Sequence, residues 1–313
     1  MLLKSNTVLA ITGPTASGKT ALSLEIASMP EIHAEIISAD SRQVFKGLDI
    51  GTAKPSAEEL ARVPHHLIDI CEPFESYNAG LFAKDATAII PSLLDQNIVP
   101  IIVGGSGLYV QALCEGFFDV PPDIENSLID ARAEVQNMYQ QMGKDDLFEA
   151  LRAVDPQSCE AYPDKNPRRI MRALEYHKAT GKLFSKEKST MMTYPTFQTI
   201  YVMIEHEREE LYQRINERCE AMWDGMLDET RIMLNRGINP NAQSLDTVGY
   251  SQAISFINGE IDQKTAIDQM KQATRNYAKR QITWSKRLEG LIMLNGNTQE
   301  MALKCLELLN ADA

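Results

Sequence analysis

The chain has 313 residues, 44% of them hydrophobic, so it is long enough to bury a sizeable core in one large domain or in a domain with an insertion. Its formal net charge of −12 argues against a protein that coats nucleic acid without specificity, because such binding depends on many lysine and arginine contacts to phosphates. No apolar run approaches the ~20 residues that span a bilayer, and the five cysteines are scattered, so we expect a cytoplasmic protein without a membrane segment.

The first hundred residues alternate short apolar runs with helical patterns. Helices are expected from about Gly18 and from about residue 78 to 97. Strands that alternate with helices in this way form a parallel sheet with helices on both faces. The expected strands are residues 7–12, 34–38, 66–70 and 98–105.

The pattern then changes twice. Residues 119–195 are polar and mostly helical, residues 197–205 resume a buried-strand pattern, and a last apolar run follows several helices at 291–295. The sequence therefore predicts an α/β fold whose core, residues 1–118 and 196–313, is interrupted by a helical insertion domain at 119–195.

A glycine-rich motif lies between the first expected strand and the first expected helix. It fits the pattern G-x-x-x-x-G-K-[ST], in which backbone N–H groups and a helix N-terminus bind an anion. Lys19 adds a mobile charge, and the hydroxyl of Thr20 can ligate Mg²⁺. The motif predicts a P-loop NTPase-like sheet with a site for a di- or triphosphate, formed by Gly13, Pro14, Thr15, Ala16, Ser17, Gly18, Lys19 and Thr20.

The acidic residue nearest this motif is in an unusual place. A P-loop hydrolase or kinase has an acid after an apolar strand, where it helps to hold Mg²⁺, but the strand at 99–103 is followed by Gly-Gly-Ser-Gly. Asp40 instead follows the second strand. Because parallel strands open onto one crevice at their carboxyl ends, we expect Asp40 to lie near the bound phosphates. From its position alone, it is a metal ligand through water, a turn or helix cap, or a general base.

Charge is distributed unevenly along the second half of the chain. Residues 119–160 are strongly acidic, whereas lysine and arginine gather at 165–188 and again at 271–287, where no acid occurs. Each basic stretch is either a solvated helix face or a surface that binds phosphate.

Seven motifs that occur in the order typical of the family make the chain resemble the tRNA dimethylallyltransferases, also called tRNA isopentenyltransferases. The resemblance runs from about Val8 to Lys286. It implies transfer of a dimethylallyl group from dimethylallyl diphosphate to the exocyclic N6 amine of the adenosine immediately 3′ of the anticodon, with release of pyrophosphate. The motifs are GPTASGKT, DSRQVFKGLDIGTAKP, PHHLID, YNAGLFAKDA, GGSGLY, NPRRIMRALE and ATRNYAKRQITW.

The resemblance also implies roles for four catalytic residues. The phosphate loop, Lys19 and a Mg²⁺ ion held by Thr20 would stabilise the leaving diphosphate, and Asp40 would accept the proton of the amine. The family has a diphosphate-binding arginine on a helix of the second half, and the matching residue is Arg218. A surface ion pair with Glu217 or Glu220 is the alternative for Arg218.

In the family, the target base is flipped from the anticodon stem-loop of the tRNA into a channel, and the resemblance extends the RNA contacts to the helical insertion. Ser106 matches a position near the target base, although a helix N-cap explains it equally, and packing also explains Trp284. Phosphate contacts fix the register, while aromatic and amide groups read or stack on unpaired bases. The residues expected to bind tRNA are Asp40, Ser41, Arg42, Gln43, Ser106, Arg168, Arg169, Arg172, Thr247, Gly249, Tyr250, Lys279, Arg280, Gln281 and Trp284.

The chain departs from the family pattern beside its Val-Gly-Tyr motif. Some relatives have flanking arginines where this chain has Asp246 and Ser251, and the acidic segment after residue 121 aligns poorly. His65 and His66 have no acid or cysteine partner at a metal-binding spacing, so we expect packing or backbone hydrogen bonds for them.

Two other functions are compatible with the phosphate loop. One is a prenyltransferase that uses free adenine nucleotides, as in cytokinin synthesis, and the other is a P-loop phosphotransferase. The long insertion and the basic stretches favour a large acceptor over a free nucleotide. The missing acid after the strand at 99–103 argues against a phosphotransferase. We expect a monomer.

Overall fold

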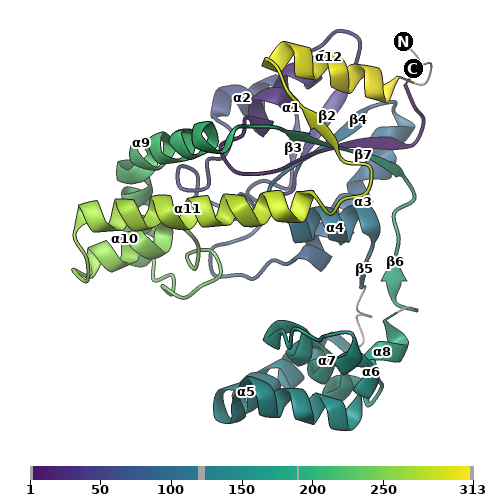
Figure 1. The fold of residues 1–313 in the computed structure, drawn as a ribbon, viewed down its shortest axis with the longest axis vertical. Helices are drawn as coiled ribbons and strands as arrows, with labels where there is room; N and C mark the ends of the chain where they lie inside the picture. Colours follow the sequence, from purple (N-terminus) through teal and green to yellow (C-terminus); the bar gives the residue numbers. More distant parts are fainter. Residues whose placement is uncertain (1–2, 119–123, 189, 311–313) are drawn as a thin grey trace. The chain divides into compact units, whose positions relative to one another are not determined.

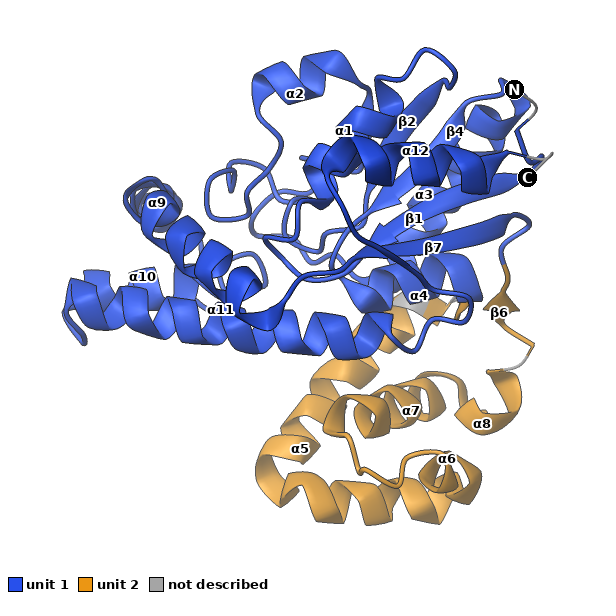
Figure 2. Cartoon of the chain, turned by 45° about the horizontal axis from the view of Figure 1, so that its top comes forward, with its two compact units in different colours: residues 1–115, 195–313 blue, residues 116–194 orange. Residues whose placement is uncertain are grey.

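The computed structural model describes residues 3–118, 124–188 and 190–310. It divides the chain into two compact units, shown in Figure 2. Unit 1 contains Met1–Glu115 and Pro195–Ala313, and unit 2 contains Gly116–Tyr194. The insertion expected at 119–195 begins with residues 119–123, which lie outside the described residues.

Unit 1 is built on a parallel sheet, so the expected α/β class is confirmed (Figure 1). Across the described residues the strand order is β3-β2-β4-β1-β7-β8. Leu9 of β1 is aligned with Ile101 of β4 on one side and with Ile200 of β7 on the other. The strands are β1 (Thr7–Thr12), β2 (Ala34–Ser38), β3 (His65–His66), β4 (Val99–Val103), β7 (Gln198–Ile204) and β8 (Ile292–Leu294).

Helices cover both faces of this sheet (Figure 1). On one face, α1 (Lys19–Ala27) and α12 (Thr298–Leu309) pack together; α3 (Ala79–Asp95) and α4 (Gly107–Glu115) lie on the other. Alternate strand residues point to the same face, and the α1 side forms a continuous core. Each fully buried leucine or isoleucine contributes about 1.5–3 kcal/mol. This core includes Leu9, Ile11, Leu22, Ile26 and Met301.

Three further helices pack against one another near the carboxyl ends of the central strands. They are α9 (Arg208–Asn235), α10 (Tyr250–Ile257) and α11 (Gln263–Ser285). Asp262 caps α11 by accepting the N–H of Thr265 at 2.7 Å. The short α2 (Ala57–Arg62) follows the long loop after β2. The strand ends, that loop and the helices α9 to α11 together surround the site.

Unit 2 is mainly helical where it is described, as expected for the insertion. A two-stranded antiparallel pair, β5 and β6, joins the chain segments that enter and leave it. The helices bury an apolar core that includes Val135, Leu151 and Tyr176. Its elements are β5 (Phe117–Phe118), α5 (Glu125–Val154), α6 (Pro156–Glu160), α7 (Pro167–Thr180), α8 (Phe184–Glu187) and β6 (Met192–Thr193).

The strand expected at 66–70 is wrong beyond its first residue. β3 pairs with β2 only through its two histidines. Asp69 has a φ of 55°, a left-handed conformation that a strand does not contain. The segment turns toward the loop after β2, where the Asp69 N–H donates to the Gln43 carbonyl at 3.1 Å.

Two composition-based expectations concern membranes and cysteines. Within residues 3–118, 124–188 and 190–310, no helix has both the length and the apolar character needed to cross a membrane. All five cysteines are buried free thiols. The cysteines therefore act in this fold as small apolar side chains.

Candidate active site

The loop between β1 and α1 leaves the N-terminus of α1 open to an anion. Gly18 takes a left-handed conformation at the N-cap position, no side chain caps the helix, and its first turn contains no acid. By contrast, Ser56 caps α2 and Asn78 caps α3. The first N–H groups of α1 and the helix dipole are therefore available for a phosphate. Ser17 of the same loop is buried, and its hydroxyl has no partner among the described residues.

Two long helices hold this loop from outside. The guanidinium of Arg214 on α9 donates to the Ala16 carbonyl at 2.9 Å. Gln281 on α11 accepts the Thr15 N–H at 2.8 Å and donates to the Gly105 carbonyl at 3.0 Å. These bonds fix the loop without any ligand.

Two adjoining cavities open at the loop, and every residue that lines them belongs to unit 1. The first, which we call the loop cavity, has a volume of about 700 Å³ and contains the phosphate loop. The second, the side cavity, has a volume of about 340 Å³ and has apolar walls that include Ile215, Met222 and Met270. The residues that line both cavities are Thr15, Ala16, Asp40, Thr52, Arg218 and Tyr277.

Lys19 lies in the loop cavity with its amine directed to the loop's own backbone. The amine donates to the carbonyls of Gly13 at 3.1 Å and Pro14 at 2.6 Å. Burial lowers the pKa of Lys19 to about 8, the Asp40 charge raises it, and the Arg218 charge lowers it. A bound phosphate would supply a counter-charge and so favour the protonated amine.

Asp40 follows β2 and forms part of both cavity walls. Its Oδ1 accepts the N–H of Arg42 at 2.8 Å and the N–H of Gln43 at 3.4 Å, so the cap of a turn, one of its three expected roles, is confirmed. The turn engages a single carboxylate oxygen. A general-base role is therefore compatible with the cap, because the second oxygen makes no hydrogen bond within the described chain.

The glycines after β4 let Asp40 face the phosphate loop. In the sheet, β4 lies between β1 and β2. A side chain at the end of β4 would therefore stand between Asp40, which follows β2, and the phosphate loop, which follows β1. Gly104 lies so close to β2 that a Cβ atom would be 2.0 Å from the Ala39 carbonyl oxygen. The hydroxyl of Ser106 accepts the Ser41 N–H at 2.9 Å, which ties this glycine-rich turn to the Asp40 loop.

Arg218 points to the phosphate loop from α9. Its Nη1 donates to the Thr15 hydroxyl at 3.3 Å. Burial lowers the pKa of Arg218, and the nearby Asp40 charge raises it. The alternative of a surface ion pair is wrong, because no ion pair joins Arg218 to Glu217 or Glu220 among the described residues; these carboxylates bond to Gln213 at 2.8 Å and Lys271 at 2.5 Å.

The residues present fit Mg²⁺ only together with a diphosphate. Thr20 lines the loop cavity in the first turn of α1. In the part of the chain that the structure describes, no three His, Cys, Asp or Glu side chains are grouped to hold a metal ion. Mg²⁺ is commonly bound by few protein ligands plus phosphate oxygens and water, which suits one hydroxyl beside a phosphate loop.

Comparison with known proteins identifies the family of this chain. Residues 43–288 match the family described as IPP transferase. The chain belongs to this family. Residues 6–72 also match the family described as isopentenyl transferase. A relative named tRNA dimethylallyltransferase, from Staphylococcus carnosus, is 42% identical over 280 residues, which cover 88% of this chain and 87% of the relative.

Solved structures of other proteins share the fold of this chain. The full-length tRNA isopentenylpyrophosphate transferase from Bacillus halodurans matches with a TM-score of 0.69 and 33% identity, over 97% of this chain and 95% of that one. A eukaryotic dimethylallyltransferase acting on tRNA matches with a TM-score of 0.75 and 26% identity, over 92% of this chain and 74% of that one. The P-loop-like fold class is thereby confirmed.

Several residues expected to bind tRNA lie around the side cavity. Arg42 and Thr247 line it, and Tyr250 is a fully buried part of its wall. The guanidinium of Arg42 bonds to the backbone carbonyls of Gln243 and Asp246, so it tethers the segment that leads to Thr247. The RNA contacts of these residues stay predictions.

Gln281 and Trp284 on α11 have a packing role in the structure. Gln281 is buried, and its amide is bonded at both ends to the chain. Gly107 leaves space for the ring of Trp284, since a Cβ atom there would be 2.2 Å from it. Both ends of the Gln281 amide are thus bonded within the chain, and the tRNA contacts expected of Gln281 and Trp284 stay predictions.

The remaining basic candidates are on exposed helix surfaces or partly covered. Lys279 and Arg280 are exposed on α11, with Arg280 5.6 Å from the centre of the Tyr277 ring. In unit 2, Arg168 and Arg169 are exposed at the start of α7, whereas Arg172 lies 5.6 Å from the centre of the Phe118 ring.

Sequence reasoning missed Tyr277, which lines both cavities. Burial raises the pKa of its phenol to about 12; the Asp40 charge acts in the same direction and the Ser106 hydroxyl opposes it. The phenol therefore stays protonated at neutral pH and can donate a hydrogen bond. The sequence did contain a signal for Tyr277. It lies three residues before Arg280 and four before Gln281, on the same helix face as these two residues expected to bind tRNA.

Of the two adjacent histidines, His65 has the backbone hydrogen bond expected of it, whereas His66 pairs with a carboxylate, which was not expected. Nδ1 of His65 is 2.7 Å from the Val63 carbonyl oxygen, and Nε2 of His66 is 2.6 Å from the Glu35 carboxylate. Both belong to the sheet edge at β3, and neither lines a cavity described above.

Proposed function

We propose that this chain transfers a dimethylallyl group from dimethylallyl diphosphate to the exocyclic N6 amine of the tRNA adenosine 3′-adjacent to the anticodon, with release of pyrophosphate. The observation that carries the proposal is the pair of joined cavities, where Asp40 lies with the phosphate loop and Arg218. Relatives over most of the chain are named tRNA dimethylallyltransferase, which supports the same activity.

The chemistry has two requirements, and each has a candidate group. The C–O bond of the donor breaks, so negative charge develops on the diphosphate; the loop N–H groups, Lys19 and Arg218 can stabilise it. The new C–N bond forms from an amine whose lone pair is delocalised into the ring, so a proton must leave. Asp40 is the candidate base, because it is the carboxylate in both cavity walls next to the loop.

The two cavities suggest where the substrates lie. The diphosphate suits the loop cavity, which has the free helix N-terminus and the cations. The side cavity combines apolar walls with Tyr250, Tyr277 and Arg280, which suits an apolar prenyl group and a flat base. Asp40 lies in the shared wall, where the amine would meet the donor.

We also propose Mg²⁺ as a cofactor, bound between Thr20 and the donor diphosphate. When bound, the ion would neutralise charge on the leaving group. The chain's part is to present the Thr20 hydroxyl at the start of α1 and to hold the diphosphate against the helix N-terminus.

Replacing Thr20 with alanine should raise the Mg²⁺ concentration required for half-maximal activity. We expect a rise of about 10- to 100-fold, the range typical when support for a metal site is lost. The measurement is initial rate against Mg²⁺ concentration at saturating donor and RNA. Thr20→Ser retains the hydroxyl and is the matched control, which should stay near the parental curve. An unchanged metal response of Thr20→Ala would contradict the role.

The proposal also covers the RNA contacts of the insertion, the oligomeric state and the cellular location. The helical insertion, through Arg168 and Arg169 at the start of α7, would contact the anticodon stem-loop. We also propose that the chain acts as a monomer. Five free cysteines support a reducing cytoplasmic location.

The function is tested with purified protein, dimethylallyl diphosphate, Mg²⁺ and an anticodon stem-loop with consecutive adenosines 3′ to the anticodon. Mass spectrometry of the digested nucleosides should find one adenosine that has gained a dimethylallyl group. A stem-loop with guanosine at the target position is the control, because guanosine has no N6 amine. Absence of product with every adenosine-containing loop would overturn the proposal.

The same assay separates the alternatives. Efficient product from AMP or ADP with none from RNA would indicate a cytokinin-type enzyme. Tight ATP binding that dimethylallyl diphosphate does not displace would indicate a phosphotransferase. The comparisons lend neither alternative support.

A further inference from the structure

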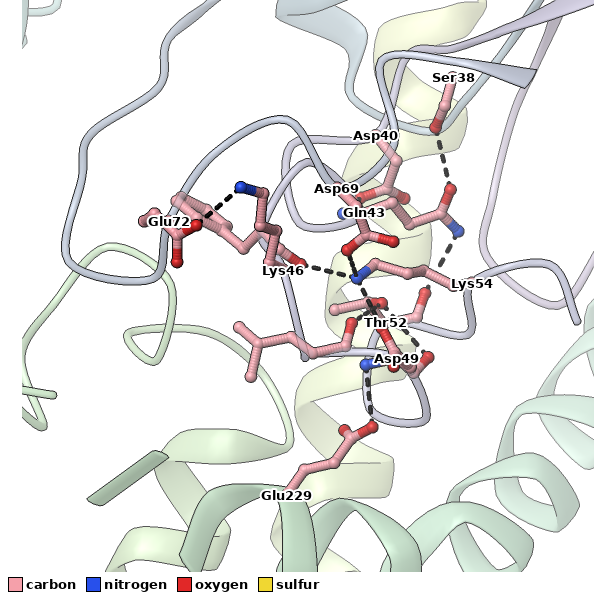
Figure 3. A network of polar contacts seen from close by, with 12 residues as sticks. Ser38, Asp40, Gln43, Lys46, Asp49, Thr52, Lys54, Asp69, Glu72 and Glu229 are labelled. Carbon is pink, nitrogen blue, oxygen red and sulfur yellow. Dashed lines mark hydrogen bonds and ion pairs between the residues drawn. The ribbon is translucent and has the colours of Figure 1, made fainter. Parts of the chain in front are cut away.

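The loop of residues 46–54, between the Asp40 turn and α2, forms part of the wall of each cavity. Gly51 and Thr52 line the side cavity, and Thr52 and Ala53 line the loop cavity. Glu229 on α9 holds the tip of this loop (Figure 3). Its carboxylate accepts three successive backbone N–H groups, those of Asp49 at 2.8 Å, Ile50 at 2.6 Å and Gly51 at 3.0 Å.

The same carboxylate also reaches α10. Tyr250 donates its phenol to Glu229 at 2.8 Å. Burial raises the pKa of Tyr250, and the Glu229 charge raises it further, so the phenol is a constant donor. Arg218 precedes Glu229 on α9 by about three helical turns. One side chain thereby joins the loop, the helix that presents Arg218 and the helix that begins with Tyr250.

Close packing on both sides of Glu229 restricts the loop to this position. A Cβ atom at Gly51 would lie 2.4 Å from the phenol of Tyr250 and 2.7 Å from Met226. A Cβ atom at Gly225 would lie 2.5 Å from Ile50. The backbones of the 46–54 loop and of α9 are therefore in close contact, and the hydrogen bonds to the Glu229 carboxylate set their relative position.

Gln43 connects this loop to Asp40. Its Oε1 accepts the Ser38 hydroxyl at 2.9 Å (Figure 3). Its Nε2 donates to the carbonyls of Thr52 at 3.4 Å and Ala53 at 3.0 Å. Its backbone N–H donates to Oδ1 of Asp40 at 3.4 Å. A change in loop position therefore moves the carbonyls that hold Gln43, and with them the turn that orients the Asp40 carboxylate.

Lys54 anchors the base of the loop. Its side chain is almost fully buried, and the amine bonds to the Phe45 carbonyl and to the carboxylates of Asp49 and Asp69. Lys54 and Gln43 therefore hold the base of the loop, and Lys54 also reaches Asp49, whereas the three N–H groups of the tip bond to Glu229. Loss of the Glu229 contacts would leave these N–H groups without that acceptor, so the tip would shift and displace the Thr52 and Ala53 carbonyls that hold Gln43.

We propose that Glu229 is a positioning residue for the transfer reaction, which sets the 46–54 loop and, through Gln43, the Asp40 carboxylate. The inference rests on the proposed function, because it assigns Asp40 to that reaction. Glu229 touches no substrate in this scheme. Its effect should appear in turnover more than in donor binding, since the diphosphate is held by the phosphate loop on the other side of Asp40.

The test is Glu229→Gln, which keeps the size of the side chain but replaces one acceptor oxygen with an NH₂ donor that faces backbone N–H groups. We expect kcat to fall by about 10- to 100-fold, as for displacement of a catalytic group by about 1 Å. The KM for dimethylallyl diphosphate should stay within about 3-fold, which is less than 1 kcal/mol. Glu229→Asp, which keeps the carboxylate, should recover part of kcat.

Asp228→Asn is the matched control. Asp228 is the exposed neighbour of Glu229 on α9, bonded to Arg231, and its substitution removes the same charge. It should have parental kcat and KM. Thermal unfolding of each variant identifies loss of fold; if Glu229→Gln does not fold, Glu229→Asp carries the test, with reduced kcat and parental donor KM expected.

Parental kcat in folded Glu229→Gln would overturn the proposal, as would a loss confined to donor KM. If Glu229→Gln is unfolded, parental kcat in Glu229→Asp would overturn it. An inactive parental protein would instead indicate failure of the proposed function, so the two failures are distinguishable.

Discussion

Replacing Asp40 with asparagine is expected to lower kcat for transfer to the stem-loop by about 10²- to 10⁴-fold, the usual contribution of a general base. Asparagine keeps an oxygen that can accept the N–H groups of Arg42 and Gln43, so the turn should persist. What it removes is the ability to take the amine proton. Single-turnover measurement at saturating donor and RNA gives the chemical step directly.

Binding provides the control for Asp40→Asn. The diphosphate is assigned to the phosphate loop, so the affinity for dimethylallyl diphosphate, measured by calorimetry without RNA, should change little. Near-parental turnover would refute the base assignment. A loss of donor affinity as large as the loss of turnover would reassign Asp40 to donor binding.

Replacing Lys19 with methionine is expected to lower kcat by about 10²- to 10³-fold, the loss typical when one donor to a developing negative charge is removed. Methionine retains the length and packing of the side chain but has no charge. The effect should exceed that of Thr20→Ala in full Mg²⁺. Steady-state rates of the parent and of Lys19→Met, at saturating donor and RNA, provide the comparison.

Lys19 also predicts a pH dependence of donor binding. The pKa of the free enzyme's amine is lowered to about 8, and a bound diphosphate favours its protonated form. Affinity for dimethylallyl diphosphate should therefore be constant below about pH 7 and weaken as the pH rises through 8, where the free amine loses its proton. Lys19→Met should abolish this decline. A decline that persists in the variant would assign the titration to another group.

Local signals in the sequence were sufficient for the phosphate loop. Glycines, lysine and threonine at fixed spacing after a β-branched run specify a strand, a turn and a helix start within about 20 residues, and the structure has each of them there. The position of Asp40 after the second strand could be predicted from the sequence equally well. Parallel strands bring their carboxyl ends together whatever their order in the sheet.

Other features of the structure depend on which distant segments of the chain pack against one another. The sequence left Arg218 between a diphosphate-binding role and a surface ion pair, and in the structure Arg218 bonds to Thr15 of the phosphate loop, 203 residues away. The strand at 66–70 failed for the same reason, because the chain turns to meet the loop after β2. Apolar pattern predicts an extended segment but not where its pairing ends.

The sequence by itself determined the α/β class, the phosphate loop, the acid after β2 and the family resemblance, because these depend on short windows of residues. Only the tertiary structure decided that the glycines after β4 lie between Asp40 and the phosphate loop, that Tyr277 lines both cavities, and that Glu229 holds residues 49–51. The Glu229 contacts span about 180 residues and exist because α9 packs against that loop. Such a contact has no local pattern, since its partners are backbone N–H groups that every non-proline residue has.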